Sequence, residues 1–157
     1  MVSVTSNLPA GDSLDEQGLR SWLQSLSPGR SETDLEKLTD ACALALEHYQ
    51  VGQTILGESV LKHAISVADI LEKMQLDWET LTAAIIHGTL PQGRVDPALL
   101  EKRFGAGVGR MVNDMARIGS LGRPRDEQLR PGESDHSENI RRMMLSIADD
   151  IRVVLIV

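Results

Sequence analysis

The sequence contains a single cysteine, Cys42, and no apolar run that approaches the length of a membrane-spanning helix. A lone cysteine excludes an internal disulfide and is typical of a reducing compartment, and its apolar neighbours predict a buried, unreactive thiol. The N-terminal stretch MVSVTSNLPAGDS lacks the basic region and the apolar core of a signal peptide. We therefore expect a cytoplasmic protein that does not associate with a membrane.

Basic residues are outnumbered, and aromatic residues are scarce. The chain has 16 Lys and Arg residues against 23 Asp and Glu residues, a formal charge of -7, which argues against direct nucleic-acid binding. Aromatic residues make up 3% of the chain, so the core must consist of Leu, Ile, Val, Ala and Met. A chain of 157 residues with 41% apolar composition is long enough for one globular domain with a single core.

No segment alternates apolar and polar residues as a strand does, whereas apolar residues recur at helical spacings of three and four. The sequence therefore predicts an all-α fold, a helical bundle of about seven to nine helices. Ser and Asp residues predict several helix starts, because their side chains accept hydrogen bonds from the first free backbone amides. The predicted helices span about 13–28, 31–52, 58–74, 77–87, 96–104, 106–118 and 138–157, the last divided near Asp149 and Asp150, with N-caps at Ser13, Ser31, Asp77 and Asp96.

The domain organisation can also be predicted. Residues 1–12 form a flexible N-terminal arm, because Pro9 and Gly11 interrupt regular structure. Residues 13–157 form one helical domain, with a polar loop at about 119–137 that contains three Gly and two Pro. We interpret this loop as a solvated connector, and a loop that covers a site is the alternative. The apolar run at the end of the sequence has no helix-stop signal, so we expect the domain to be truncated at its C-terminal end.

Two histidines lie on neighbouring predicted helices, and each has a structural alternative to a metal-binding role. His63 borders an apolar helix face and should point inward, where a hydrogen-bonded core histidine is the common outcome. His87 ends the next helix, where an imidazolium complements the helix dipole, and Gly88 suits the C′ position. The apolar face beside His63 consists of Val60, Ala64, Val67, Leu71 and Met74.

A divalent metal centre needs carboxylates beside the histidines, and an acid or base to serve the water that the metal activates. None of the five residues after His87 is acidic; they are Gly88, Thr89, Leu90, Pro91 and Gln92. The sequence also contains no phosphate-binding P-loop, no dinucleotide-binding glycine motif and no nucleophile elbow. From the residues alone, the two histidines therefore do not complete a metal shell.

Four stretches together resemble a known family. They are Gly57-Glu58 followed by His63, LDWETLTAAIIH at 76–87, Phe104-Gly105, and ENIRRMMLSIADDIRVVLI at 138–156. The order of these stretches is similar to that in the N-terminal HD domain of RelA/SpoT-type (p)ppGpp synthetase/hydrolases. The resemblance implies an all-helical HD fold. Active members of this family use Mn²⁺ to hydrolyse (p)ppGpp to GDP or GTP and pyrophosphate.

The resemblance also identifies residues that are missing. His63 matches the first metal ligand of the active members, and His87 matches the second. Gly88 stands where the family has the aspartate of its His-Asp pair, and the fourth ligand, another aspartate, is expected just beyond Val157. The family's Glu-Asp pair, which serves the attacking water, is replaced by Pro91 and Gln92.

These departures define vestigial positions rather than a complete site. The family's arginine ahead of Gly57-Glu58 is replaced by Ile55 and Leu56. We expect no catalytic residue and no metal site, with His63 and His87 as vestigial ligand positions. The residues of the vestigial pocket are Glu58, Pro91, Gln92, Asn139 and Arg142.

The resemblance therefore implies an inactive, regulatory pseudo-hydrolase HD domain of a RelA-type GTP pyrophosphokinase that acts in (p)ppGpp metabolism and the stringent response. The chain itself is expected to hold no cofactor. Its expected partner is the synthetase domain of the same parent chain, and the parent would reach the ribosome through other domains. The alternative is an active Mn²⁺-dependent (p)ppGpp 3′-pyrophosphohydrolase with substituted ligands. A third interpretation is a helical module unrelated to nucleotides, in which both histidines are structural.

Overall fold

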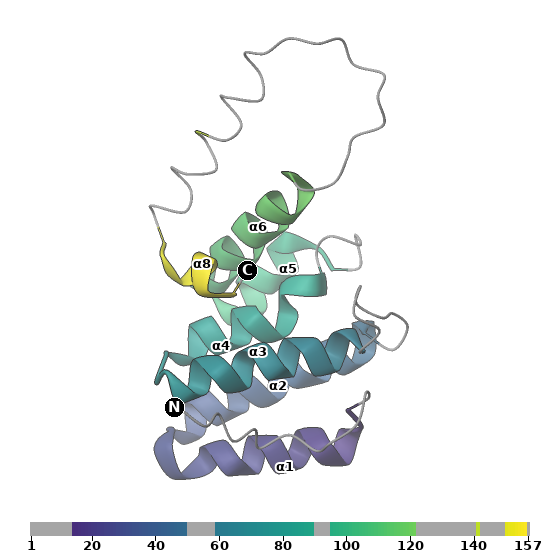
Figure 1. Cartoon of the computed structure of the whole chain (residues 1–157), viewed down its shortest axis with the longest axis vertical. Coiled ribbons are helices and arrows are strands. Elements are labelled where there is room, and N and C mark those ends of the chain that lie inside the picture. The colour runs from purple at the N-terminus through teal and green to yellow at the C-terminus, as the bar shows by residue number, and fades with distance from the viewer. Residues whose placement is uncertain (1–13, 50–58, 90–94, 122–140, 142–149, 157) are drawn as a thin grey trace, which may run out of the picture.

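The computed structural model describes residues 14–49, 59–89, 95–121, 141 and 150–156. These residues form helices and no strand (Figure 1), which confirms the prediction of an all-α fold. The predicted arm at 1–12 lies outside the described residues. The elements are α1 (Glu16–Leu26), η1 (Ser27–Gly29), α2 (Glu32–His48), α3 (Val60–Lys73), α4 (Trp78–Ile86), η2 (His87–Thr89), α5 (Pro97–Phe104), α6 (Ala106–Leu121) and α8 (Arg152–Ile156), where η denotes a 3₁₀ helix.

Side-chain caps start most of these helices, as the sequence predicted. Ser31, Asp77 and Asp96 each accept a hydrogen bond from a backbone N–H in the first turn of α2, α4 and α5. At α1 the carboxylate of Asp15 accepts from the N–H of Gly18 at 2.7 Å, while the predicted cap, Ser13, lies outside the described residues. Local capping chemistry is therefore sufficient to place these starts.

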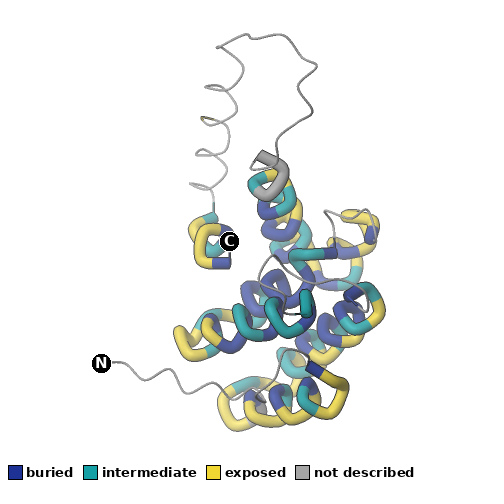
Figure 2. The backbone as a smooth tube through the Cα atoms, turned by 45° about the vertical axis from the view of Figure 1, so that its right-hand side comes forward, coloured by how far each residue is buried: buried dark blue, intermediate teal, exposed yellow. Residues whose placement is uncertain are grey.

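Helix α4 lies at the centre of the bundle, where it packs against α2, α3 and α6. Every residue from Thr80 to Ile86 is buried, so this stretch of α4 has no solvent-facing side. Helix α1 forms an outer layer against α2 (Figure 1), and Figure 2 shows the buried residues on the sides of the helices that face one another. The core is mostly aliphatic, as expected, although Trp22 and Phe104 are its two bulkiest fully buried side chains.

The predicted apolar face of α3 is only partly correct: Ala64 and Leu71 are buried, but the buried side extends to other residues. Of the predicted face, Val60 and Val67 are only half-buried and Met74 is 52% exposed. Both sides of α3 are apolar, so its own periodicity does not determine the buried side, which is selected by packing against α4. The residues that α3 buries are Leu61, Ala64, Ile65, Ala68, Asp69 and Leu71.

The short helix α5 and the long helix α6 pack together around Gly105. Gly105 has φ 94°, a conformation that glycine adopts without steric cost, so the chain can end α5 and begin α6 directly. Spacing by three and four predicts one apolar side of α6, and its residues are all buried: Val108, Met111, Val112 and Met115. Helix α6 continues to Leu121, so the first three residues of the predicted loop at 119–137 are helical, and the rest of that loop lies outside the described residues.

The last helix, α8, follows Asp150, whose carboxylate accepts a hydrogen bond from the N–H of Arg152. Asp150, at the predicted division of this segment, therefore caps the final helix. Spacing by three and four predicts Ile151, Val154 and Leu155 as the apolar stripe of this segment. That prediction is wrong, because these residues are exposed and Val153 and Ile156 are buried instead. In so short a helix, packing against α6 selects the buried residues.

Polar contacts join the outer helices to the core. The indole N–H of Trp22 donates to the buried carboxylate of Asp69 at 3.2 Å, and Lys73 donates to its other oxygen at 2.8 Å. Arg30 pairs with Glu72 and donates to the carbonyl of Leu76 at 2.7 Å. These contacts fix α1 and the α1–α2 connection against α3.

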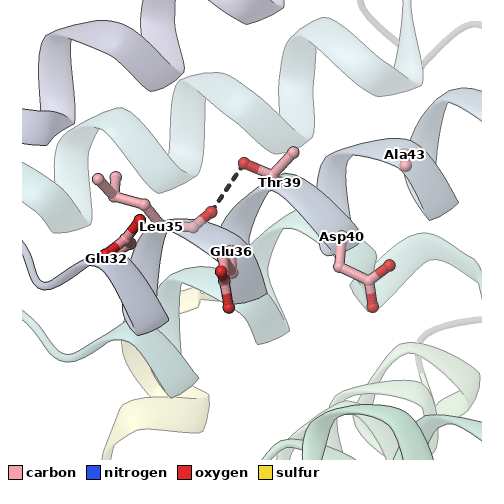
Figure 3. Close-up of a pocket in the computed structure, with 6 residues that line it drawn as sticks. All are labelled: Glu32, Leu35, Glu36, Thr39, Asp40 and Ala43. Atoms are coloured by element: carbon pink, nitrogen blue, oxygen red, sulfur yellow. Dashed lines mark hydrogen bonds between the residues drawn. The ribbon is translucent and has the colours of Figure 1, made fainter.

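Asp40 of α2 pairs with Arg103 of α5 through two hydrogen bonds. The hydrogen bond from Arg103 lowers the pKa of Asp40. Asp40 also borders a surface hollow along the outer side of α2, drawn in Figure 3 and lined by Glu32, Leu35, Glu36, Thr39, Asp40 and Ala43. Because Asp40 is already paired, this hollow is a solvated helix surface rather than a convergent binding site.

Two expectations from composition can be compared with the structure. Cys42 is buried, and burial raises the pKa of its thiol to about 12, in agreement with the prediction of an inert core cysteine. Among the described residues, no helix combines the length and the apolar character needed to cross a bilayer.

Candidate functional site

The two histidines singled out from the sequence meet in the structure. His63 lies one turn into α3, and His87 lies where α4 passes into η2. Because α3 and α4 pack along each other, the two imidazole rings approach edge to face, with centroids 6.2 Å apart and an interplanar angle of 64°. His63 itself is half-buried, and its ring lies beside that of His87.

Hydrogen bonding fixes the tautomer of His87. Its Nδ1 lies 2.6 Å from the carbonyl oxygen of Ala84, and since a carbonyl can only accept, Nδ1 carries the proton and Nε2 holds the lone pair of the neutral ring. Burial lowers the pKa of His87, the proximity of His63 lowers it further, and the Ala84 hydrogen bond opposes both effects. A neutral ring is favoured, so the interpretation of His87 as an imidazolium that complements the helix dipole is not supported.

Gly88 follows the C-cap residue His87 and so stands at the predicted C′ position, but its backbone is not that of a typical C′ glycine. A C′ glycine normally has positive φ, but among the described glycines only Gly105 does. Helix α4 ends instead by tightening into the 3₁₀ turn His87–Thr89. The N–H of Gly88 donates to the hydroxyl of Tyr49 at 2.8 Å, and Tyr49 itself is the buried C-cap residue of α2.

Position 88 is closed on the side that faces α2. A Cβ atom built on Gly88 would lie 2.9 Å from Oη of Tyr49, 3.2 Å from its Cε1 and 3.3 Å from its Cζ. Helical spacing makes Tyr49 an apolar position of its helix, but nothing in the sequence pairs it with Gly88, which is 39 residues away. The structure thus adds Tyr49 to the residues that form this site.

Five of the predicted site residues lie outside the described part of the chain: Glu58, Pro91, Gln92, Asn139 and Arg142. Within the described ranges, no three His, Cys, Asp or Glu side chains come together in a way that could hold a metal ion. A Mn²⁺ centre of the kind that the family resemblance implies needs carboxylate oxygens as well as imidazole nitrogens. The residues described here supply the two imidazoles and, at position 88, a backbone amide, so they do not by themselves fit such a centre.

The other end of α4 is joined to α8 by Arg152. Its guanidinium contacts Asp77 at 3.0 Å, Glu79 at 3.3 Å and Asp150 at 2.7 Å. Hydrogen bonding to Asp150 and the charges of the acids raise the pKa of Arg152, and Arg152 lowers the pKa of Asp150. The pKa of Asp77 is also lowered, because hydrogen bonds from Thr80 and Arg152 outweigh the effect of its burial. These acids serve α4 and α8 and do not face the two histidines as ligands.

The chemistry available in the described site is limited. Two imidazoles can accept a proton or donate a lone pair, but a hydrolytic reaction also needs a water activated by a metal or by a nearby base. No carboxylate among the described residues accompanies the pair as a third ligand. The described site thus supplies the imidazole ligands of a metal centre without the carboxylate ligands.

Comparisons with known proteins identify a family and several relatives. Residues 41–157 match the HD domain family. A guanosine-3′,5′-bis(diphosphate) 3′-pyrophosphohydrolase of Vibrio cholerae is 31% identical over 126 residues, which cover 80% of this chain and 17% of the relative. The bifunctional (p)ppGpp synthase/hydrolase SpoT of Escherichia coli is 29% identical over 140 residues, which cover 89% of this chain and 19% of the relative.

A plant protein is similar over a comparable range. The putative GTP diphosphokinase RSH1 of Oryza sativa chloroplasts is 29% identical over 138 residues, which cover 85% of this chain and 16% of the relative. The chain thus spans less than a fifth of the length of each of these relatives. From the family match and these similarities, the chain belongs to the HD domain family and is homologous to RelA/SpoT-type (p)ppGpp hydrolases and RSH GTP diphosphokinases.

Proposed function

We propose that the chain is a non-catalytic, regulatory pseudo-hydrolase HD domain of a RelA-type GTP pyrophosphokinase, and that it acts in (p)ppGpp metabolism and the stringent response. The parent enzyme, working in the cytoplasm, transfers pyrophosphate from ATP to GTP or GDP through a separate synthetase domain. The HD domain packs against that synthetase domain and biases its activity, while other domains of the parent contact the ribosome. The HD domain itself binds neither nucleic acid nor a membrane.

One observation carries this proposal: the histidine pair lacks an acid. His63 and His87 lie close together as metal ligands would, with ring centroids 6.2 Å apart, but no third ligand joins them among the described residues. The position that follows His87 is a glycine whose amide donates to a tyrosine hydroxyl. A carboxylate at that position would have supplied both negative charge and a further metal ligand.

The missing acids also remove the groups that act on water. The family uses a Glu-Asp pair at the positions of Pro91 and Gln92, neither of which can take a proton from water. General acid–base assistance alone contributes about 10²–10⁴-fold to a reaction rate. Loss of both the acid beside the metal and this pair therefore supports a domain that has kept the fold and not the reaction.

A second candidate function is an active Mn²⁺-dependent (p)ppGpp 3′-pyrophosphohydrolase with substituted ligands. Two observations favour it: the histidine rings remain in contact, and the bacterial relatives from Vibrio cholerae and Escherichia coli carry hydrolase names. For this candidate, groups from other parts of the chain would have to replace both the metal ligand at position 88 and the acidic pair.

Release of pyrophosphate from ppGpp in the presence of Mn²⁺ distinguishes the two candidates. We expect the 157-residue chain to release none above the level without protein, and the Vibrio cholerae relative is the positive control. Mn²⁺-dependent release that is lost in both His63→Ala and His87→Ala would overturn the proposal and establish the hydrolase. Release that both variants retain would indicate a contaminating enzyme, which a repeat with repurified protein removes.

A further inference from the structure

The contact between Tyr49 and Gly88 points to a reason for the glycine that goes beyond the loss of a ligand. We propose that Tyr49 occupies the space that a side chain at position 88 would need, and so closes the former ligand position by packing. This inference rests on the proposed function, since it concerns how the same site is kept from forming a metal centre. It adds Tyr49 as a residue that positions η2 and excludes a ligand there.

Tyr49 is held in place both at its backbone and at its side chain. Tyr49 caps α2, and its own N–H donates to the carbonyl of Ala45 at 2.8 Å, so its backbone is held by the helix. Its side chain is 5% exposed, and its hydroxyl accepts the N–H of Gly88 at 2.8 Å. A buried ring that is held at both ends cannot swing aside without disturbing the core.

The backbone does not explain why position 88 is a glycine. Its φ is not positive, so a side chain would fit the local conformation without strain. The obstacle is steric, because a Cβ at this position would lie 2.9 Å from the tyrosine hydroxyl, closer than a Cβ atom normally approaches an oxygen atom. Gly29 offers the contrast: it also lies in a 3₁₀ turn, and a Cβ there would have no atom within 4 Å.

The packing of Tyr49 against Gly88 is therefore incompatible with the metal centre of the family, which needs an aspartate at position 88. An aspartate at position 88 would have to displace Tyr49 before its carboxylate could turn towards His87. The same displacement would remove the acceptor of the Gly88 amide, which lies in a half-buried turn. Restoring the acid alone is thus expected to disturb the fold instead of rebuilding a site.

A double-mutant cycle in the 157-residue chain tests this contact by thermal unfolding, followed by circular dichroism. Gly88→Ala should lower the midpoint temperature by roughly 2–6 °C, whereas the matched control Gly29→Ala should leave it unchanged or raise it slightly. Tyr49→Phe removes the hydroxyl and should also lower the midpoint. When the two changes are combined, Gly88→Ala should cost less than it does in the presence of the hydroxyl.

The cycle can fail in two clear ways. If Gly88→Ala behaves like Gly29→Ala, or if the two losses add fully, Tyr49 does not restrict position 88. A second measurement uses Mn²⁺ alone, observed by electron paramagnetic resonance, with the Gly88→Asp variant. We expect this variant to bind no more Mn²⁺ than the unmodified chain, and a new stoichiometric site would overturn the inference. Hydrolysis of ppGpp by the unmodified chain would defeat the proposed function and leave this cycle unaffected, so the two failures can be told apart.

Discussion

Replacement of Asp69 by alanine is expected to destabilise the chain more than its polar character suggests. Asp69 is the one charged residue that is buried in the described part of the chain, at 3% exposure. One of its oxygens accepts from the indole of Trp22, which is fully buried, and the other from Lys73. Asp69→Ala would leave the indole N–H without an acceptor in a place that water does not reach.

The magnitude follows from the two contacts. An unsatisfied buried donor costs about 1–3 kcal/mol. The Lys73 contact contributes less, on the order of 0.3–0.5 kcal/mol, because the lysine is one-third exposed and the pair has i,i+4 spacing. We therefore expect Asp69→Ala to lower the free energy of unfolding by about 2–3 kcal/mol. Asp69→Asn retains an acceptor oxygen for Trp22 and should cost less than half of this.

Urea unfolding followed by circular dichroism at the helix band gives both values without relying on tryptophan fluorescence. The decisive comparison adds Trp22→Phe, which removes the donor that Asp69→Ala leaves unpaired. In that background Asp69→Ala should cost about 1–2 kcal/mol less than in the unmodified chain. An equal cost in both backgrounds, or an Asp69→Asn variant as unstable as Asp69→Ala, would refute the reasoning.

Three further predictions follow from single contacts. Ile65→Ala should lower the free energy of unfolding by about 2–5 kcal/mol because Ile65 is fully buried, whereas Ile70→Ala on the same helix should lower it by less than about 1 kcal/mol because Ile70 is 52% exposed. Equal losses in urea unfolding would mean that α3 buries the other side. The pKa of His87 is lower in the folded chain than in the unfolded chain, so on acidification the unfolded chain binds the proton first. The contribution of His87 to the free energy of unfolding is therefore complete above about pH 6.5 and falls as the pH drops from there towards the folded-state pKa. His87→Gln should flatten this decline, and an unchanged pH profile would contradict the prediction. Arg152→Lys cannot reproduce the contacts of the guanidinium with three carboxylates, so hydrogen exchange of α8 should accelerate severalfold while that of α4 stays slow.

Features that depend on neighbouring residues in the sequence could be predicted. The N-caps at Ser31, Asp77 and Asp96 were placed correctly, because each side chain bonds to an amide two or three residues further along. His63 and His87 were predicted to lie on neighbouring helices, and the packing of α3 against α4 brings their rings together. These interactions are local, or follow from one short connection.

The buried side of α3 was not predictable from periodicity alone. Ile65 and Val67 are both apolar and β-branched, and only the position of α4 decides that Ile65 is fully buried and Val67 half-buried. The same holds for α8, where Val153 is buried and Val154 is exposed. When apolar residues surround a short helix, its contacts with other helices determine its orientation.

The contact between Gly88 and Tyr49 was not predictable for a similar reason. A glycine after an apolar helix usually marks a C′ position with positive φ, and no local signal distinguishes that case from a glycine required by a distant side chain. Tyr49 stands 39 residues earlier, at the end of another helix. Only the packed structure shows that this tyrosine occupies the space next to the glycine.

The central claim is that this HD domain keeps two histidines and has lost its metal centre. Calorimetric titration of the 157-residue chain with Mn²⁺ at neutral pH tests the claim most directly, with the Vibrio cholerae relative titrated in parallel. The chain is expected to show no saturable, stoichiometric binding. Micromolar binding of one Mn²⁺ per chain that disappears in His63→Ala and in His87→Ala would contradict the claim and restore the site as a metal centre.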